Sequence, residues 1–202
     1  MTLTVDKQIE AFPFPNLSKI VGTPTYETIK IVNKEISANA VTINSKNGGT
    51  YGYLALTIPK AIYSTLTQTV FTAPTAPTTP VLTGLTAPQI SAANPTYDKS
   101  KIVFNEYTSL QLALRKQLIA AVDPIYLRAI RDKYVGFGNS TILQMLTHLY
   151  KSYAKITPSD LEKNDARLKE SYDPNQPPEF LIQQVQDAVD YVSHANCPYS
   201  PE

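Results

Sequence analysis

Apolar residues recur with helical spacing in several stretches of the chain, most regularly within residues 120–153. After a glycine-containing break at residues 136–139, one apolar stripe of period 3.6 is formed by Ile142, Met145, Leu146, Leu149, Tyr150 and Tyr153. Before the break, Asp123-Pro124 ends one helix and starts another, because proline is tolerated only in a helix's first turn. The pattern predicts two helices folded back on each other across a glycine turn, with Ser140 capping the second.

Other stretches alternate between helical patterns and breaks. Helical spacing is found in residues 24–43, 60–66, 98–122, 157–170 and after the turn at 172–178. Thr157-Pro158-Ser159-Asp160 matches a capping box with proline in the first turn, a strong local helix start. Residues 51–58, YGYLALTI, are short, aromatic and β-branched and stop at Pro59, which predicts a strand.

Prolines define two segments without a regular pattern. The alternating prolines of FPFPN predict that residues 1–23 form an extended arm. Residues 72–96 are rich in proline and threonine, contain no charged residue and lean towards polyproline II geometry. They are expected to span a distance along the surface, although such a segment could also present a PxxP ligand to an aromatic groove.

These elements predict a mostly α fold with a short β element near 51–58 and a proline-rich linker. The expected organisation is an arm at 1–23 and a helical N-terminal lobe at 24–156, with the loop at 72–96 inside that lobe. An acidic helical segment at 157–202 would begin a truncated second lobe, because composition and charge change near residue 157.

The net charge of +1 conceals an asymmetry along the chain. Residues 1–157 contain fifteen Lys/Arg and eight Asp/Glu, giving +7, whereas residues 158–202 contain three Lys/Arg and nine Asp/Glu, giving −6. Such asymmetry occurs in proteins with a nucleic-acid partner, an interaction tail or complementary ends that stack head to tail. It also occurs in proteins whose solvated faces merely differ in sign.

The sequence contains little that points to chemistry. A single cysteine, Cys197, excludes an internal disulfide, and His194 with Cys197 is too few ligands for zinc. His148 lies beside the apolar stripe and is expected to be a packed or surface residue. We therefore expect no catalytic residue, no metal, no cofactor and no small-molecule substrate. Without a signal-peptide pattern or an apolar run of ~18 residues, the expected location is cytoplasmic, with no membrane partner.

One basic constellation is a candidate for nucleic-acid contact. Residues 115–133 carry five cations against Asp123 and Asp132, a local charge of +3; the cations are Arg115, Lys116, Arg128, Arg131 and Lys133. If the chain folds back at Pro124, these cations could form one patch that contacts phosphates. The alternative is an ordinary helical ion pair between Arg128 and Asp132 at i, i+4.

Two long stretches resemble a known family. VDPIYLRAIRDKYVGFGNSTILQMLTHLY (122–150) and ITPSDLEKNDARLKESYDPNQP (156–177) resemble Gag-type polyprotein segments of copia-like LTR retrotransposons found in algal and protist genomes. FPNLSKIVGTPTYETIKIVNKEISANAV (14–41) and GGTYGYLALTIP (48–59) resemble the N-terminal part of such proteins. The resemblance covers most of the chain.

The resemblance implies a helical capsid lobe, with part of a second, that self-assembles into particles enclosing RNA. The partners would be other copies of the chain, with RNA held through parts not in this chain, and the chain would be a fragment or a domesticated copy. The predicted self-association surface is Met145, Leu149 and Tyr153. The alternative is a cytoplasmic adaptor that binds a peptide or helix through the 120–153 hairpin, which requires an exposed apolar groove there.

Overall fold

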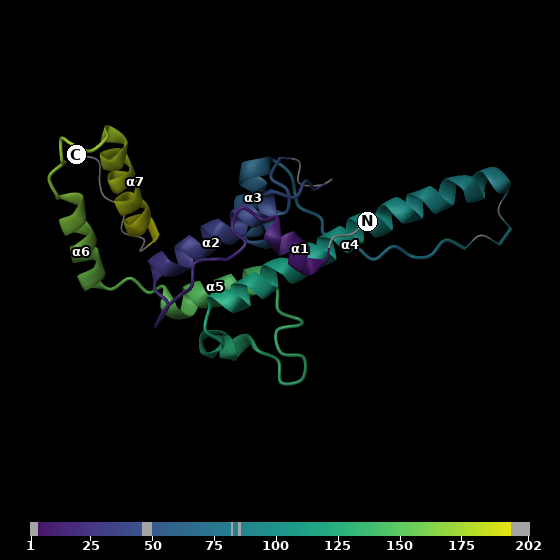
Figure 1. The fold of residues 1–202 in the computed structure, drawn as a ribbon, viewed down its shortest axis with the longest axis horizontal. Coiled ribbons are helices and arrows are strands. Elements are labelled where there is room, and N and C mark those ends of the chain that lie inside the picture. Colours follow the sequence, from purple (N-terminus) through teal and green to yellow (C-terminus); the bar gives the residue numbers. More distant parts are fainter. Residues whose placement is uncertain (1–3, 46–49, 82, 85, 195–202) are drawn as a thin grey trace.

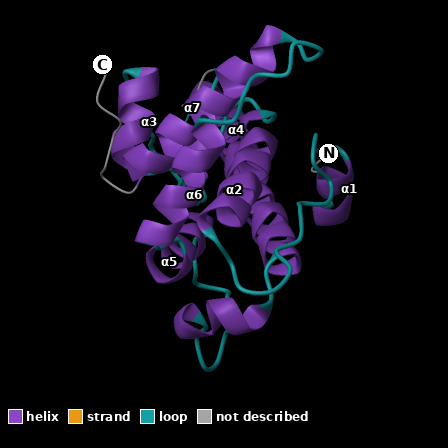
Figure 2. Ribbon diagram, turned by 90° about the vertical axis from the view of Figure 1, so that its left-hand side faces the viewer, coloured by secondary structure: helices purple, strands orange, loops and turns teal. Residues whose placement is uncertain are grey.

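The computed structural model describes residues 4–45, 50–81, 83–84 and 86–194, and the described part is mostly helical (Figures 1 and 2). The elements in chain order are α1 (Val5–Glu10), α2 (Tyr26–Val41), the 3-10 helix η1 (Leu54–Leu56), α3 (Lys60–Thr67), α4 (Ala87–Ala121), the 3-10 helix η2 (Pro124–Ile130), α5 (Ile142–Tyr153), α6 (Pro158–Leu168) and α7 (Pro178–His194). The predicted mostly α class is confirmed.

The core forms where α2, α4 and α5 pack against one another (Figure 1). Each helix contributes fully buried aliphatic side chains; examples are Ile29 and Ile36 of α2, Leu114 and Leu118 of α4, and Met145 and Leu149 of α5. The apolar stripe predicted in residues 142–153 is the face that α5 turns into this core. Its burial stabilises the fold by roughly 1.5–3 kcal/mol for each large aliphatic side chain.

The strand predicted at residues 51–58 is wrong. This stretch is a turn followed by η1, and no strand is present among the described residues. The backbone N–H of Tyr53 donates to the carbonyl of Ala40 (3.0 Å), so the segment caps the C-terminal end of α2 instead of pairing with another strand. Aromatic and β-branched residues favour a strand only where a neighbouring strand can pair with them.

The N-terminal segment contains more structure than the predicted extended arm. α1 forms near its start and packs against α4, with Lys116 paired to Asp6 at 2.6 Å. The following residues contribute Phe12, Leu17 and Ile20 to the core. The prolines exclude regular helix only locally. The N-terminal segment as a whole packs against α2 and α4.

α4 begins earlier than predicted, at Ala87 instead of near residue 98, so the predicted loop at 72–96 is too long. Its start is fixed by a capping box, in which the amide of Thr86 donates to Oε1 of Gln89 (2.8 Å), and by a proline in the first turn. Pro95 lies inside the helix, where a sequence pattern indicates a break. The first turns of α4 project from the body of the molecule (Figure 1).

Residues 70–81 form neither helix nor strand, and their exposure repeats every three residues. Phe71, Pro74, Pro77 and Pro80 are half-buried while the residues between them are exposed. A period of three is that of polyproline II. Because the prolines are the more covered side, the segment offers mainly threonine and alanine to solvent, which weakens its interpretation as a PxxP ligand.

Of the two helices predicted for the hairpin at residues 120–153, the second forms as an α-helix and the first is a 3-10 helix. α5 forms as expected, but Thr141, and not Ser140, caps it by accepting from the amide of Gln144 (3.1 Å). The Ser140 hydroxyl donates to the carbonyl of Ile130 instead (3.1 Å). The first arm is the 3-10 helix η2, which begins at Pro124 as predicted.

α6 and α7 form an antiparallel pair at the end of the described chain (Figure 1). The capping box predicted at Thr157 is confirmed, because its hydroxyl accepts from the amide of Asp160. Between the helices, the buried Asn164 of α6 donates through Nδ2 to the carbonyl of Ala188 in α7 (3.1 Å). This bond fixes the register of the pair.

Tyr63 provides a stability test of the core. Its side chain is fully buried, and within the described chain its hydroxyl has no hydrogen-bond partner. An unpaired buried hydroxyl costs about 1–3 kcal/mol. We therefore expect Tyr63→Phe to raise the free energy of unfolding by about 1 kcal/mol in urea denaturation.

The matched control is Tyr53→Phe in the same aromatic cluster, because the Tyr53 hydroxyl is hydrogen-bonded with Ser45. That substitution should lower stability by about 1 kcal/mol. A loss of stability in Tyr63→Phe equal to that of the control would show that the Tyr63 hydroxyl is paired in solution.

Candidate interaction surfaces

The predicted self-association residues are not on the surface. Met145 and Leu149 are 0% exposed, and both belong to the core. Tyr153 is half-buried, with its ring edge-on to Tyr126 at a centroid distance of 5.2 Å. The first two side chains are therefore unavailable to another molecule in this conformation. The same burial counts against the adaptor hypothesis, which required an exposed groove on this hairpin.

The five cations predicted to form one patch fall into two groups. Arg115 donates through Nη1 to the carbonyl of Gly138 (2.6 Å), and burial lowers the pKa of its guanidinium. Lys116 lies 2.6 Å from Asp6. These two hold the loop before α5 and helix α1, respectively, so their main roles are structural.

The other three cations, Arg128, Arg131 and Lys133, are exposed and follow one another closely along the chain. Within the described residues none of them forms an ion pair, and the Arg128–Asp132 pair considered from the sequence is not made. Oδ1 of Asp132 instead accepts the backbone N–H groups of Val135 (2.9 Å) and Tyr134 (2.7 Å). These two bonds lower the pKa of the Asp132 carboxyl.

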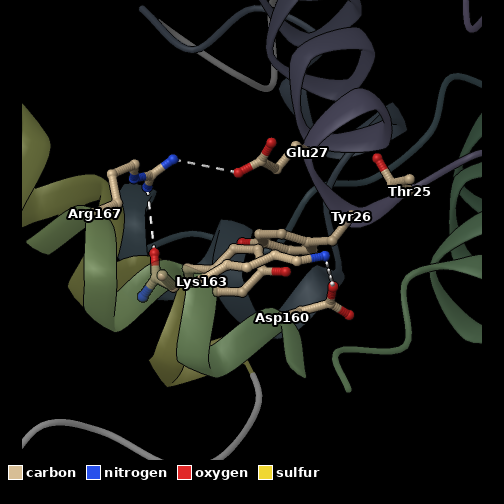
Figure 3. A pocket seen from close by; sticks show the side chains of 8 residues that line it. Thr25, Tyr26, Glu27, Asp160, Lys163 and Arg167 are labelled. Atoms are coloured by element: carbon tan, nitrogen blue, oxygen red, sulfur yellow. Dashed lines mark hydrogen bonds and ion pairs between the residues drawn. The ribbon is translucent and has the colours of Figure 1, made fainter. Parts of the chain in front are cut away.

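A polar cleft of about 290 Å³ lies between the start of α2 and the α6–α7 pair (Figure 3). Arg167 approaches Glu27 (3.5 Å) and donates to Oδ1 of Asn164 (3.3 Å), while Lys163 lies 3.9 Å from Asp160. Each cation of the cleft thus has a carboxylate beside it. The cleft presents no surplus charge to a ligand, and its residues serve to connect α6 to α2.

The same junction joins α7 to α2 through charge and aromatic contact. Nζ of Lys30 lies 3.6 Å from Asp187 and 3.5 Å from Asp190. The ring of Tyr26 stacks on His194 with a centroid distance of 4.2 Å, and burial together with the nearby Lys30 lowers the pKa of that histidine. Part of the charge asymmetry seen in the sequence is therefore used within the chain, because acidic residues of the second segment pair with cations of the first.

The two histidines have ordinary packing environments. Nε2 of His148 lies 3.0 Å from the carbonyl of Tyr126, and its Nδ1 lies 3.3 Å from the Ser152 hydroxyl. The suggested His194–Cys197 pair extends outside the described residues. Of the residues that are described, no three or more His, Cys, Asp or Glu side chains are grouped so as to hold a metal ion. In the same part of the chain, none of the helices combines the length and apolar character that crossing a membrane requires.

Helix α7 carries an apolar surface that the sequence predicted only as one face of a helix. The apolar stripe predicted on α7 is half covered: Ala188 and Val192 are buried, at 0% and 4% exposure. Beside them, Ile182, Val185 and Val189 remain 57%, 41% and 39% exposed. We call these three residues the α7 stripe. Spacing at i, i+3 and i+7 places them along one side of the helix.

Comparison with known proteins finds no matching family model, no similar curated protein and no similar solved structure.

Proposed function

We propose that this chain is a non-enzymatic structural protein of the retrotransposon Gag type, which associates with copies of itself and encloses RNA. The resemblance of residues 122–150 and 156–177 to copia-like Gag segments supports the class. The observation that carries self-association is the α7 stripe, an apolar helix face that the rest of the described chain leaves half uncovered. Exposed contiguous apolar surface on a helix is typical of an interaction site.

The charges around the α7 stripe favour a second copy as its partner. Gln186 and Ser193, each four residues after a stripe residue, border it and are uncharged. Glu179, three residues before Ile182, places one exposed carboxylate at its N-terminal end. The acidic residues Asp187 and Asp190 are turned away from it, towards Lys30. In an antiparallel pair the two Glu179 carboxylates lie at opposite ends of the contact, so the two faces can meet without like-charge repulsion. An antiparallel α7–α7 contact would also set the two helix dipoles favourably.

The expected affinity follows from the area available. Completing the burial of a half-exposed aliphatic side chain stabilises by roughly 1 kcal/mol, and a symmetric contact does so for six of them. Association costs about 4 kcal/mol or more in lost translational and rotational freedom. The balance of about 2 kcal/mol corresponds to a very weak contact, with a dissociation constant of about 30 mM for this face alone. Weak individual contacts suit a protein that assembles through many copies.

We expect static light scattering up to millimolar protein concentration to show reversible self-association that persists in about 1 M salt, because apolar burial is not screened. Val189→Glu should weaken the dimer at least tenfold, since it places a charge in the centre of the contact. Electron microscopy of concentrated wild-type protein should show larger assemblies that the variant does not form.

The control is Ile102→Glu, which introduces the same charge at a 61% exposed isoleucine on α4. It should leave dimerisation unchanged. A strictly monomeric wild-type protein at high concentration would remove self-association from this chain. Equal effects of the two substitutions would place the contact elsewhere than the α7 stripe.

A further inference from the structure

The last residues of η2 and the exposed turn that follows combine cations with an aromatic ring. These residues, 128–135, are here called the basic tip; Arg128, Arg131 and Lys133 are exposed, and Tyr134 is 86% exposed. Nζ of Lys133 lies 5.5 Å from the centroid of the Tyr134 ring. With Asp132 as the one carboxylate among three cations, the tip has a net charge of +2.

The basic tip is held in one shape by hydrogen bonds at both of its ends. Asp132 and Gly136 exchange backbone bonds in both directions, at 2.8 and 3.2 Å, and the Asp132 carboxylate binds the two amides of the turn. Behind the turn, Arg115 binds the carbonyl of Gly138 and Ser140 binds that of Ile130. The tip therefore projects its side chains from a preorganised base, which lowers the entropic cost of binding.

Two features of the basic tip point to one class of ligand. Three exposed cations that form no ion pair with any described carboxylate lie within a stretch of six residues and provide contacts for successive phosphates. A tyrosine ring that is almost fully exposed offers a flat face on which an unpaired base can stack. Duplex nucleic acid would use only the cations, because its bases are already stacked and paired.

We propose that the basic tip binds single-stranded nucleic acid, with a base stacked on Tyr134 and phosphates bound by Arg128, Arg131 and Lys133. This rests on the proposed function for its biological role, because it names the surface on which an assembling protein would hold RNA. The binding itself does not depend on the α7 stripe. An anionic membrane shares part of this chemistry, but three cations and few apolar side chains supply only a weak anchor for a bilayer.

The test is fluorescence anisotropy of a labelled twelve-nucleotide oligouridine with the full chain at low salt. Binding is expected to be weak and to fall steeply as salt rises. Tyr134→Ala should lower the affinity about fivefold to tenfold, while Tyr134→Phe, which keeps the ring, should bind like the wild type. Arg131→Gln should lower the affinity severalfold and reduce the slope of log K against log salt by about 0.7.

The matched control is Tyr97→Ala, because Lys101 lies over the Tyr97 ring at 5.8 Å in a similar cation–ring pair on α4. It should leave the affinity unchanged. The wild type and Val189→Glu are both measured, so that loss of dimerisation and loss of nucleic-acid binding are seen separately. Absence of binding to the oligonucleotide, or an equal loss in Tyr97→Ala and Tyr134→Ala, would overturn the proposal. Binding to phosphatidylserine vesicles without binding to the oligonucleotide would also overturn it.

Discussion

Gly52→Ala is expected to destabilise the protein by about 4 kcal/mol, near the upper end of single-residue effects. Gly52 is buried and has φ +47°, a left-handed conformation that an L side chain rarely adopts. A Cβ atom at this position would lie 2.5 Å from the carbonyl oxygen of Ile43, 2.6 Å from that of Val41 and 3.0 Å from that of Ala40. These are backbone atoms, so no side-chain rotation can relieve the clash.

The cost of the steric clash at Gly52 can be separated from the cost of the left-handed backbone conformation. Gly22 also has a positive φ, +76°, but a Cβ atom there would meet nothing within 4 Å. Gly22→Ala should therefore cost only about 1–2 kcal/mol, the price of the left-handed conformation. Urea denaturation of both variants gives the comparison, and equal losses would show that the segment after α2 moves freely to accommodate the new atom.

Gly52 also explains why the strand predicted at residues 51–58 does not form. The aromatic and β-branched content of YGYLALTI is a local property, whereas a strand requires a partner that lies elsewhere in the chain. Here the glycine allows the chain to approach the last carbonyls of α2, and the amide of Tyr53 binds one of them. Nothing in the local sequence indicated which helix end this segment would cover.

Helices with strong end signals were predicted best. The capping box at Thr157 and the apolar stripe of α5 are both local patterns, and both are present. The start of α4 was missed because Pro95 was interpreted as a break. Thr86 and Gln89, three positions apart at the true start, form a capping box that the uncharged, proline-rich surroundings concealed.

The candidate surfaces could be predicted only in part, because exposure depends on contacts between distant residues. Met145 and the α7 stripe have similar local patterns, yet Met145 is buried by α2 and α4 while the stripe is half open. In the same way, Lys116 is paired to Asp6, 110 positions away, and Arg131 has no ion pair within the described chain. The five cations were grouped because they are close in sequence. In the folded chain they lie in two separate environments.

Asn39 provides the other large expected effect, because it lies at the centre of a buried polar network. The side chain is 0% exposed, and its Oδ1 accepts the backbone N–H of Phe14 at 3.0 Å. Its Nδ2 donates to the carbonyl of Phe14 (2.8 Å) and to Oε1 of Gln117 (3.0 Å). Gln117 in turn donates to the carbonyls of Phe14 and Pro15, both at 2.8 Å. Two amide side chains on core helices thus bind the N-terminal segment that was predicted to be an extended arm.

Asn39→Ala is expected to lower the free energy of unfolding by about 3–4 kcal/mol. The substitution removes the partner of the part-buried Phe14 N–H and of Oε1 of the buried Gln117, and each such loss costs about 1–3 kcal/mol. Asn33→Ala is the matched control on the same helix, because Asn33 is half-buried and its two side-chain bonds are long: it donates to the Tyr150 hydroxyl and accepts from the Ser37 hydroxyl, both at 3.4 Å. That change should cost less than about 1 kcal/mol.

A double-mutant cycle decides whether the network acts as a unit. If it does, Asn39→Ala and Gln117→Ala together should cost about 1–2 kcal/mol less than the sum of the single losses, because each single change already leaves the other amide poorly paired. Limited proteolysis after Lys19 should accelerate in both single variants, since the segment holding Phe12, Leu17 and Ile20 is anchored to α2 and α4 through these bonds. Strict additivity with unchanged proteolysis would mean that apolar burial alone holds this segment. The two amides would then be tolerated in the core without anchoring anything.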